Sequence, residues 1–284
     1  MSKNSITVSN EILCLLKCPI CKTRFTNYIK YIACERKHTF DFSKSGYLNL
    51  LKRNKNVIYD KYLFNARKQI AKNGFFDGVE QQIIKIIIDK YQLKKQLTIL
   101  DLGCGDGTIF SNILLALKQT GIQYNAIGID SSKEGIRLAS RSDKSVLWLV
   151  SDIANIPIIE NNIDVILNTL SPANYGEFNR LLKDDGIIIK TVPNQEYLTE
   201  LRRIIHLKDY SNSNVVSLFS KNTLNYKSVK VTYQKKLSNE EQKLVFKMTP
   251  LTERIEFNEQ RSNFPNTATI DVTVLIGDKK TLPI

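Results

Sequence analysis

The sequence predicts an α/β fold in which a Rossmann-like sheet of seven strands follows a small N-terminal β module. From Leu97 onward, apolar runs of strand length alternate with amphipathic stretches of helical length. Continuous apolar strands joined by crossover helices indicate a parallel sheet that is covered on both faces. Four of the five cysteines lie within the first 34 residues, before this alternation begins. At roughly 150 residues per domain, a chain of 284 residues has room for one large and one small unit.

The predicted elements follow this division in order. The β module has short strands at residues 28–33 and 39–42, then a basic loop at 52–56 and helices at 59–72 and 79–91. The large sheet has strands at 97–102, 124–129, 146–150, 163–167, 187–191, 226–233 and 269–276. Helices at 108–118, 133–141, 175–182, 195–204 and 239–248 lie between them. The last two strands alternate in polarity, which predicts an antiparallel finish to the sheet.

Positive charge is concentrated in the first 75 residues. That stretch holds fifteen Lys and Arg but only four acidic residues, a local charge of +11 out of +13 for the whole chain. Such a field attracts a polyanion, and nucleic acid is the commonest one in a cell. A solvated, Lys-rich surface from an organism with an A/T-biased genome is the alternative that charge alone leaves open.

No membrane segment is expected. The longest apolar run near the N-terminus covers residues 12–16, far fewer than the roughly 20 residues that span a bilayer. We therefore expect a cytoplasmic protein.

The spacing of cysteine and histidine in the β module is typical of a metal site. Cys18 and Cys21 form a C-x2-C pair, and twelve residues later Cys34 and His38 form a C-x3-H pair. Three thiolates and one imidazole make a closed tetrahedral set that suits one structural zinc ion. A redox C-x-x-C pair would open a helix after a strand, whereas this pair precedes a polar turn. Cys14 lies outside the pattern, and we expect a small buried side chain there.

A glycine-rich loop, DLGCGDG, follows the first strand of the large sheet and precedes a helix. It contains Asp101, Gly103, Gly105 and Asp106. An acidic strand end followed by G-x-G brings the backbone close to a bound adenosyl group at the carboxyl edge of the sheet. A dinucleotide site would have a third glycine where this chain has Thr108. Acids beside the loop suit the sulfonium and ammonium groups of S-adenosylmethionine and would repel a pyrophosphate.

Two further acids follow the next strands. Asp130 closes the second strand, where a carboxylate can accept hydrogen bonds from both ribose hydroxyls, and Asp152 follows the third strand, within reach of the adenine edge. A loop position without cofactor contact is the alternative for Asp152. Three acids at successive strand ends predict the sheet of a class I S-adenosylmethionine-dependent methyltransferase. Cys104, between the two glycines, is expected to be a packed residue and not a nucleophile.

The loop after the fourth strand is the expected position of the methyl acceptor. Its candidate residues are Asn168, Ser171, Asn174 and Tyr175. Enzymes that methylate exocyclic amino groups of nucleic acids have Asn/Asp/Ser-Pro-Pro-aromatic there, and Ala173 replaces the second proline. Amino methylation is therefore disfavoured, and an ordinary proline turn before a helix is the alternative. No residue of the sequence identifies itself as a general base.

The order of these motifs resembles the guanine-N1 methyltransferases of bacterial large-subunit ribosomal RNA, the RlmA family. The resemblance covers nearly the whole chain and rests on CPIC, CERKH, TFDFSKSGYLNLL, ARKQIAKNGFF, DLGCGDG, SPANYGEF, KTVPNQEYL and MTP. The SPANYGEF form is similar to the second, Gram-positive type, which methylates a hairpin guanine near the macrolide-binding exit tunnel. The resemblance implies a homodimer whose zinc modules help to form an RNA cleft, and a link to macrolide resistance.

Carried over by position, the family's zinc ligands fall on Cys18, Cys21, Cys34 and His38. Its methyl-donor contacts fall on Phe76, Gly105, Asp106 and Tyr197. Phe76 stands where a relative has Tyr, so a hydrogen bond at that position would be lost. Tyr197 stands where a relative has His.

The sequence therefore predicts methyl transfer from S-adenosylmethionine to N1 of a guanine in a 23S rRNA hairpin. Guanine N1 carries a proton that must leave before or during transfer, and the base must leave its stack or lie in a loop. The alternatives are a methyltransferase for another RNA or a small molecule, with a purely structural zinc module, and a non-catalytic RNA-binding protein. The predicted boundaries are 1–51 for the zinc-binding RNA-recognition module, 52–92 for the basic linker and helices, and 93–284 for the methyltransferase domain.

Overall fold

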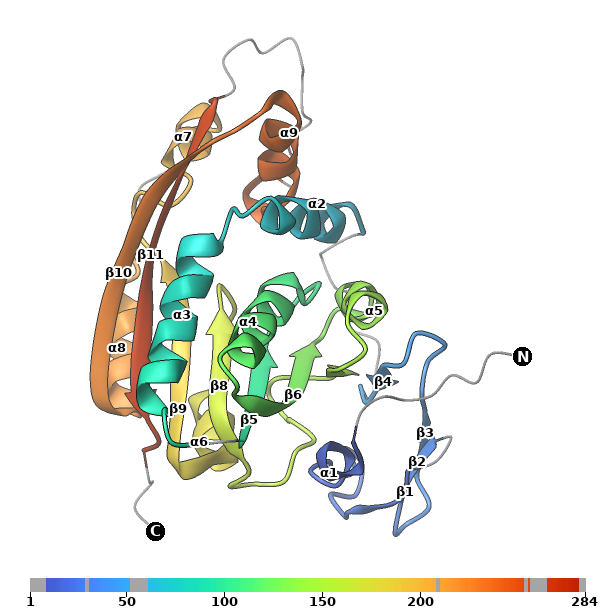
Figure 1. Ribbon diagram of the computed structural model, residues 1–284. Helices are drawn as coiled ribbons and strands as arrows, with labels where there is room; N and C mark the ends of the chain where they lie inside the picture. The colour runs from blue at the N-terminus through green and yellow to red at the C-terminus, as the bar shows by residue number, and fades with distance from the viewer. Residues whose placement is uncertain are drawn as a thin grey trace.

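The computed structural model describes residues 9–28, 31–51, 61–94, 96–207, 210–252, 255 and 265–280. This part of the chain forms a three-stranded sheet and an eight-stranded sheet, with helices packed on the larger one (Figure 1). None of the helices in these ranges combines the length and the apolar character needed to cross a bilayer.

The large sheet is mixed, with the strand order β10-β11-β9-β8-β5-β6-β7-β4. From β9 to β4 all neighbours are parallel, and β11 pairs antiparallel with both β9 and β10. The predicted seven strands and antiparallel finish are confirmed, and β4 adds an eighth strand at the edge. In chain order the strands are β4 (Leu48–Asn49), β5 (Gln96–Leu102), β6 (Gln123–Asp130), β7 (Leu147–Val150), β8 (Ile163–Thr169), β9 (Leu182–Pro193), β10 (Leu224–Lys236) and β11 (Thr267–Asp278).

Helices cover both faces of this sheet, and a separate apolar core lies under each face. One face carries α2 (Lys61–Lys72), α3 (Asp77–Lys90), α4 (Thr108–Gln119), α5 (Lys133–Ser142) and α9 (Asn239–Lys247). The other carries α1 (Asn10–Leu13), α6 (Tyr175–Leu181) and α8 (Ser213–Asn222). α7 (Thr199–Ile204) packs against β11, and the short 3₁₀ turn η1 (Pro250–Thr252) follows α9.

Local sequence signals explain where several elements begin. The Ser132 hydroxyl caps α5 by accepting a hydrogen bond from the Gly135 N–H, and Ser238 with Glu241 forms a capping box at α9. β5 and β8 are buried along almost their whole length, as expected for parallel strands covered on both faces. β10, at the open edge, is exposed over its first five residues and then alternates between half-buried and exposed residues.

The β module is an antiparallel sheet of β1 (Phe25–Tyr28), β2 (Tyr31–Cys34) and β3 (Thr39–Asp41). It lies beside β4, the edge strand of the large sheet (Figure 1). Leu16, Phe25 and Ile32 of the module belong to the same apolar core as strands β5 and β6. β4 continues the contact, because Leu48 and Asn49 pair with β7. The module is therefore packed onto the sheet and is not suspended from a linker.

The structure corrects some predicted elements. A single strand over 28–33 is wrong, since β1 and β2 are two antiparallel strands whose chain reverses within that range. The sequence there contains no Gly or Pro to mark the reversal. Cys14 is exposed and not buried, because α1 buries Ile12 and Leu13 instead. Helix α8 was not predicted, and the predicted loop at 52–56 lies outside the described residues.

Candidate metal centre and active-site cavity

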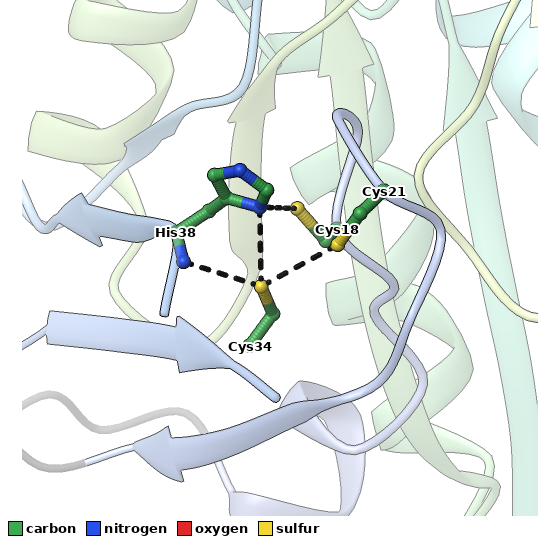
Figure 2. A group of neighbouring side chains, drawn as sticks. All are labelled: Cys18, Cys21, Cys34 and His38. Carbon is green, nitrogen blue, oxygen red and sulfur yellow. Dashed lines mark hydrogen bonds between the residues drawn. The ribbon is translucent and has the colours of Figure 1, made fainter. Parts of the chain in front are cut away.

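The four predicted metal ligands converge within the β module. Cys18 and Cys21 precede β1, Cys34 ends β2, and His38 directly precedes β3. Figure 2 shows the four side chains directed toward one another. One ligand atom from each residue can be chosen so that all four lie within 4.8 Å of one another. The structure thus brings together every residue that the spacing selected.

The separations within this cluster fit a single zinc ion. Nδ1 of His38 lies 3.6 Å from Sγ of Cys18 and 3.4 Å from Sγ of Cys34, and the Sγ atoms of Cys21 and Cys34 are 3.6 Å apart. A tetrahedral ion with Zn–S of about 2.3 Å and Zn–N of about 2.0 Å separates such donors by roughly 3.5 to 3.8 Å. Four protein donors complete the coordination shell, so the zinc is structural.

Two similar turns shape the ligand pairs. Lys22 follows the first pair with φ of 66°, and Lys37 lies within the second with φ of 63°. The Lys22 N–H donates to the Cys18 carbonyl at 2.9 Å, and the Lys37 N–H donates to the Cys34 carbonyl at 2.8 Å. Left-handed residues other than glycine are uncommon, and here they close the turns that hold the ligands.

A cavity of about 460 Å³ lies at the carboxyl edge of the large sheet. Its size is in the range of sites for small molecules and cofactors. The wall is formed by the glycine loop after β5, the loops after β8 and β9, helix α2 and the segment after α9. The predicted site residues on this wall are Phe76, Asp101, Gly103, Gly105, Asp106, Asp130, Ser171 and Tyr197.

Gly103 marks the point where the glycine loop meets the acceptor loop. It has φ of +81°, and a Cβ atom there would lie 1.9 Å from Oγ of Ser171. Only glycine accommodates both the backbone conformation and the close neighbour. The absence of a side chain at this position therefore brings the predicted donor and acceptor loops into contact.

Asp101 is the best indication that the cavity binds a cation. The residue is 5% exposed, and within the described part of the chain its Oδ1 atom is buried without a hydrogen-bond partner. Burial, with a smaller contribution from the Asp130 carboxylate, raises the pKa of Asp101 to about 8. A buried carboxylate without a partner is costly, and a cationic group in the cavity would remove that cost. The ammonium group of S-adenosylmethionine fits this requirement.

Asp130 and Asp106 stabilise the glycine loop. Asp130 accepts hydrogen bonds from the Gly105 N–H at 2.9 Å and the Ser132 N–H at 2.7 Å. Asp106 accepts from the N–H and the hydroxyl of Thr108. Burial raises the pKa of both carboxyl groups. A carboxylate has about four acceptor sites, so both residues keep capacity for a ligand.

Asp152 is not part of the cavity wall. Its Oδ1 atom accepts a hydrogen bond from the Ala154 N–H at 3.0 Å, and the described wall residues do not include it. Phe76 and Tyr197 do lie on the wall, and Phe76 packs edge to face on Phe75. The structure thus brings seven of the eight predicted donor-binding residues to one cavity.

The acceptor-loop candidates occupy different positions. Ser171 lines the cavity. Asn168 lies beneath the loop, where its Nδ2 donates to the carbonyl oxygens of Leu102 at 2.8 Å and Pro172 at 3.1 Å. Asn174 instead caps α6 by accepting from the Glu177 N–H.

Tyr175 also lies off the cavity wall. Its ring packs edge to face on Phe178 and Phe219, and burial raises its pKa to about 12. Among the described residues, the cavity wall includes neither Asn174 nor Tyr175.

Several residues of the cavity wall were not predicted from the sequence. Lys190 lies in β9 within the run IIIKTV and is 3% exposed. A charged residue inside a buried parallel strand is the signal that could have identified it. Arg67 donates from Nε to the Met248 carbonyl at 2.8 Å and so ties α2 to the segment after α9. The remaining wall residues that were not predicted include Phe64, Arg202, Tyr210 and Leu251.

Cys104 lies on the wall but is poorly suited to be a nucleophile. Burial, and the neighbouring carboxylates, raise the pKa of its thiol. A thiol with a raised pKa contains little thiolate at neutral pH. This agrees with the expectation of a packed residue.

Comparisons with known proteins match both parts of the chain. The family model "RlmA, N-terminal" matches residues 16–55, and the model "Methyltransferase domain" matches residues 93–247. A Bacillus subtilis protein named "Putative 23S rRNA (guanine-N(1)-)-methyltransferase YxjB" is 36% identical over 93% of this chain and 97% of its own length.

A second relative and one solved structure are less similar. A 23S rRNA (guanine(748)-N(1))-methyltransferase from Streptomyces fradiae is 25% identical over 66% of each chain. The crystal structure of the Bacillus subtilis YcgJ protein is 17% identical with a TM-score of 0.48, over 71% of this chain and 100% of that one.

Proposed function

Because the chain belongs to the RlmA family of S-adenosylmethionine-dependent rRNA (guanine-N1)-methyltransferases, we propose that it methylates N1 of one guanine in a 23S rRNA hairpin. The observation that supports this best is the fusion, in one chain, of a Cys3His zinc ribbon with a methyltransferase sheet. S-adenosylmethionine supplies an electrophilic methyl group. The protein must then hold the donor, place the guanine in line with it and remove the N1 proton.

The seven cavity residues form the proposed donor site. Asp101 pairs with the donor ammonium through its unpartnered oxygen, and Asp130 accepts from the ribose hydroxyls. Gly103 and Gly105 allow the backbone to approach the donor, with Asp106 beside them, and the rings of Phe76 and Tyr197 border the same cavity. The acceptor base enters beside Ser171, which faces the glycine loop.

The proposed partner is ribosomal RNA. The fifteen Lys and Arg residues among the first 75 supply a positive electrostatic field that attracts RNA. The zinc ribbon packs beside the β4 edge of the large sheet, and the cavity lies at the carboxyl ends of the strands of the same sheet. We further propose a cytoplasmic homodimer in which two ribbons border one RNA cleft. The similarity to the second, Gram-positive type supports a target guanine near the macrolide-binding exit tunnel, where methylation would affect sensitivity to macrolides.

The direct test is to incubate the purified protein with labelled S-adenosylmethionine and rRNA from a strain that lacks the enzyme. We expect label in 1-methylguanosine and a reverse-transcription stop at one guanine, because the methyl group blocks the Watson–Crick edge. At limiting donor concentration, Asp101→Asn should weaken the stop. Asp184→Asn removes a carboxylate that is 93% exposed and should leave it unchanged. Label that remains in small molecules after ribonuclease treatment would favour the alternative function.

A further inference from the structure

The fold itself gives no reason for a lysine at position 190. It lies in β9 between the buried residues Ile189 and Thr191, and only 3% of its own surface is exposed. Among the described residues no carboxylate forms an ion pair with it. Nζ donates instead to Oδ1 of Asn168 and to the Ser171 carbonyl oxygen, each at 2.6 Å. The amine therefore rests on two neutral oxygens at the wall of the cavity.

Both oxygens are held in place. The Asn168 amide donates from Nδ2 to two carbonyl groups, so its Oδ1 atom must face Lys190. The Ser171 carbonyl belongs to the loop that touches Gly103. A neutral amine has two N–H groups and one lone pair, whereas an ammonium has three N–H groups. Two acceptors match the neutral form, and the lone pair is then left for a third partner.

The surroundings favour loss of the proton from Lys190. Burial lowers its pKa to about 8, and the neighbouring residues on β8 and β11, Asn168 and Leu275, carry no charge. An amine with this pKa is partly neutral at the pH of a cell. The charged or titratable side chains on the same cavity wall are Arg67, Asp101, Cys104, Asp106, Asp130, Tyr197, Arg202 and Tyr210.

We propose that Lys190 is the general base that accepts the N1 proton of the guanine during methyl transfer. This inference rests on the proposed function. The N1–H bond breaks and its proton passes to Nζ, which becomes an ammonium. The electron pair on N1 forms the bond to the methyl carbon, and the electron pair of the methyl–sulfur bond stays on sulfur.

The position of Lys190 distinguishes it from the carboxylates of the cavity. Asp101 lies near the end of β5, Asp130 ends β6, and Asp106 lies in the glycine loop between β5 and α4. Asp106 and Asp130 accept hydrogen bonds within the glycine loop and its flanks. Lys190 pairs in register with Asn168 beneath the acceptor loop. Lys190 is therefore the titratable group that the acceptor loop itself holds, at the place where the guanine must enter.

The decisive variants are Lys190→Arg and Lys190→Met, assayed in single turnovers with saturating donor and rRNA. Arginine keeps the charge and can donate to both oxygens, but it cannot accept a proton at these pH values. We expect both variants to lose about 10²- to 10⁴-fold in rate, the usual contribution of a general base. Donor and RNA affinities should stay within about threefold, as a general-base role does not require tighter binding. Lys183→Arg, on the same strand and paired with Asp164, is the matched control.

The pH profile supplies a second measurement. The wild-type rate should rise about tenfold per pH unit at low pH and level off near pH 8, while the variants lose this inflection. A wild-type rate that does not change between pH 6 and 9 overturns the proposal, whatever the variants do. So does a Lys190→Arg enzyme with the wild-type rate and profile, or loss of donor binding in both variants, because the lysine would then only support the loop. A wild-type enzyme that fails to methylate guanine N1 contradicts the proposed function instead.

Discussion

The zinc ribbon and the methyl-donor cavity hold their ligands in opposite ways. The four zinc donors lie between positions 18 and 38 and face one another, whereas the cavity wall draws on residues from Phe64 to Leu251. The ribbon is too small to form a stable core of its own, so the binding of zinc stabilises its fold. The large sheet has extensive cores on both faces, so the folded sheet itself positions the residues of the cavity. One ligand is structural and the other can be exchanged at each turnover.

The largest expected effect comes from breaking the metal centre. Cys34→Ser should remove zinc and lower rRNA methylation at least 100-fold, because a structural zinc contributes about 10 to 16 kcal/mol to the folding of a small module. Donor affinity should change by less than about threefold, since the cavity is built by the large sheet. Elemental analysis, calorimetry with S-adenosylhomocysteine and the methylation assay check the three parts.

Cys14→Ser is the matched control for this variant, because Cys14 is exposed and outside the cluster. It should retain zinc and activity. If Cys34→Ser destroyed donor binding as well, the two regions would form one folding unit, and the contrast between them would be lost.

A smaller effect is expected from the unpartnered carboxylate. Asp101→Asn should weaken binding of S-adenosylhomocysteine about 10- to 100-fold, because a hydrogen bond to a charged group is worth about 1.5 to 3 kcal/mol. Zinc content should not change. Calorimetry measures the affinity, with Asp184→Asn as the control on an exposed carboxylate. Unchanged affinity would mean that Asp101 does not face the donor.

Gly103 offers a third test, of how closely the two loops approach. Gly103→Ala and Gly121→Ala both place a side chain at positive φ, but only the first meets a neighbour, Ser171. The positive φ alone should lower the free energy of unfolding by about 1 to 2 kcal/mol in both variants. The contact with Ser171 should lower it further in Gly103→Ala, as measured by denaturant titration. Only Gly103→Ala should also slow methyl transfer, by about tenfold, since a small misplacement of reacting groups is costly. Equal rates in the two variants would contradict a role for the loop contact.

A further test concerns the pH dependence of stability without donor. The pKa of Asp101 is raised from 3.8 to about 8 in the folded state, so the folded protein binds more protons than the unfolded chain between these values. Its contribution to stability is therefore present at low pH and is lost as pH rises from about 4 to 8. Asp101→Asn lacks this loss, and its advantage over wild type in denaturant titrations should grow between pH 5 and 8. A constant difference would contradict the raised pKa of Asp101 in the folded state.

The contrast also explains what the sequence could predict. The zinc ligands form two local pairs, and the spacing alone identified all four because each pair closes a single turn. The parallel sheet and the glycine loop were equally accessible, since apolar strands and G-x-G patterns are local features. The strand reversal within 28–33 was missed because no turn residue marks it.

The acceptor side depends on contacts between distant segments. Lys190 and Asn168 meet only through the pairing of β8 and β9, so no local pattern identified Lys190. Asn174 and Tyr175 lie in the expected loop, but the helix that starts there turns one into a cap and the other into an apolar contact. The sequence indicated which residues lie in the loop near the site. The direction of the backbone decides which of their side chains face the cavity.

The two-residue strand β4 also affects how readily the large sheet can pair with another chain. It covers the free side of β7, and the Leu50 N–H adds a bond to the Val150 carbonyl at 2.8 Å. An uncovered edge strand is a template for pairing with another chain. β4 therefore keeps the main-chain groups on this side of β7 from pairing with a second copy of the chain.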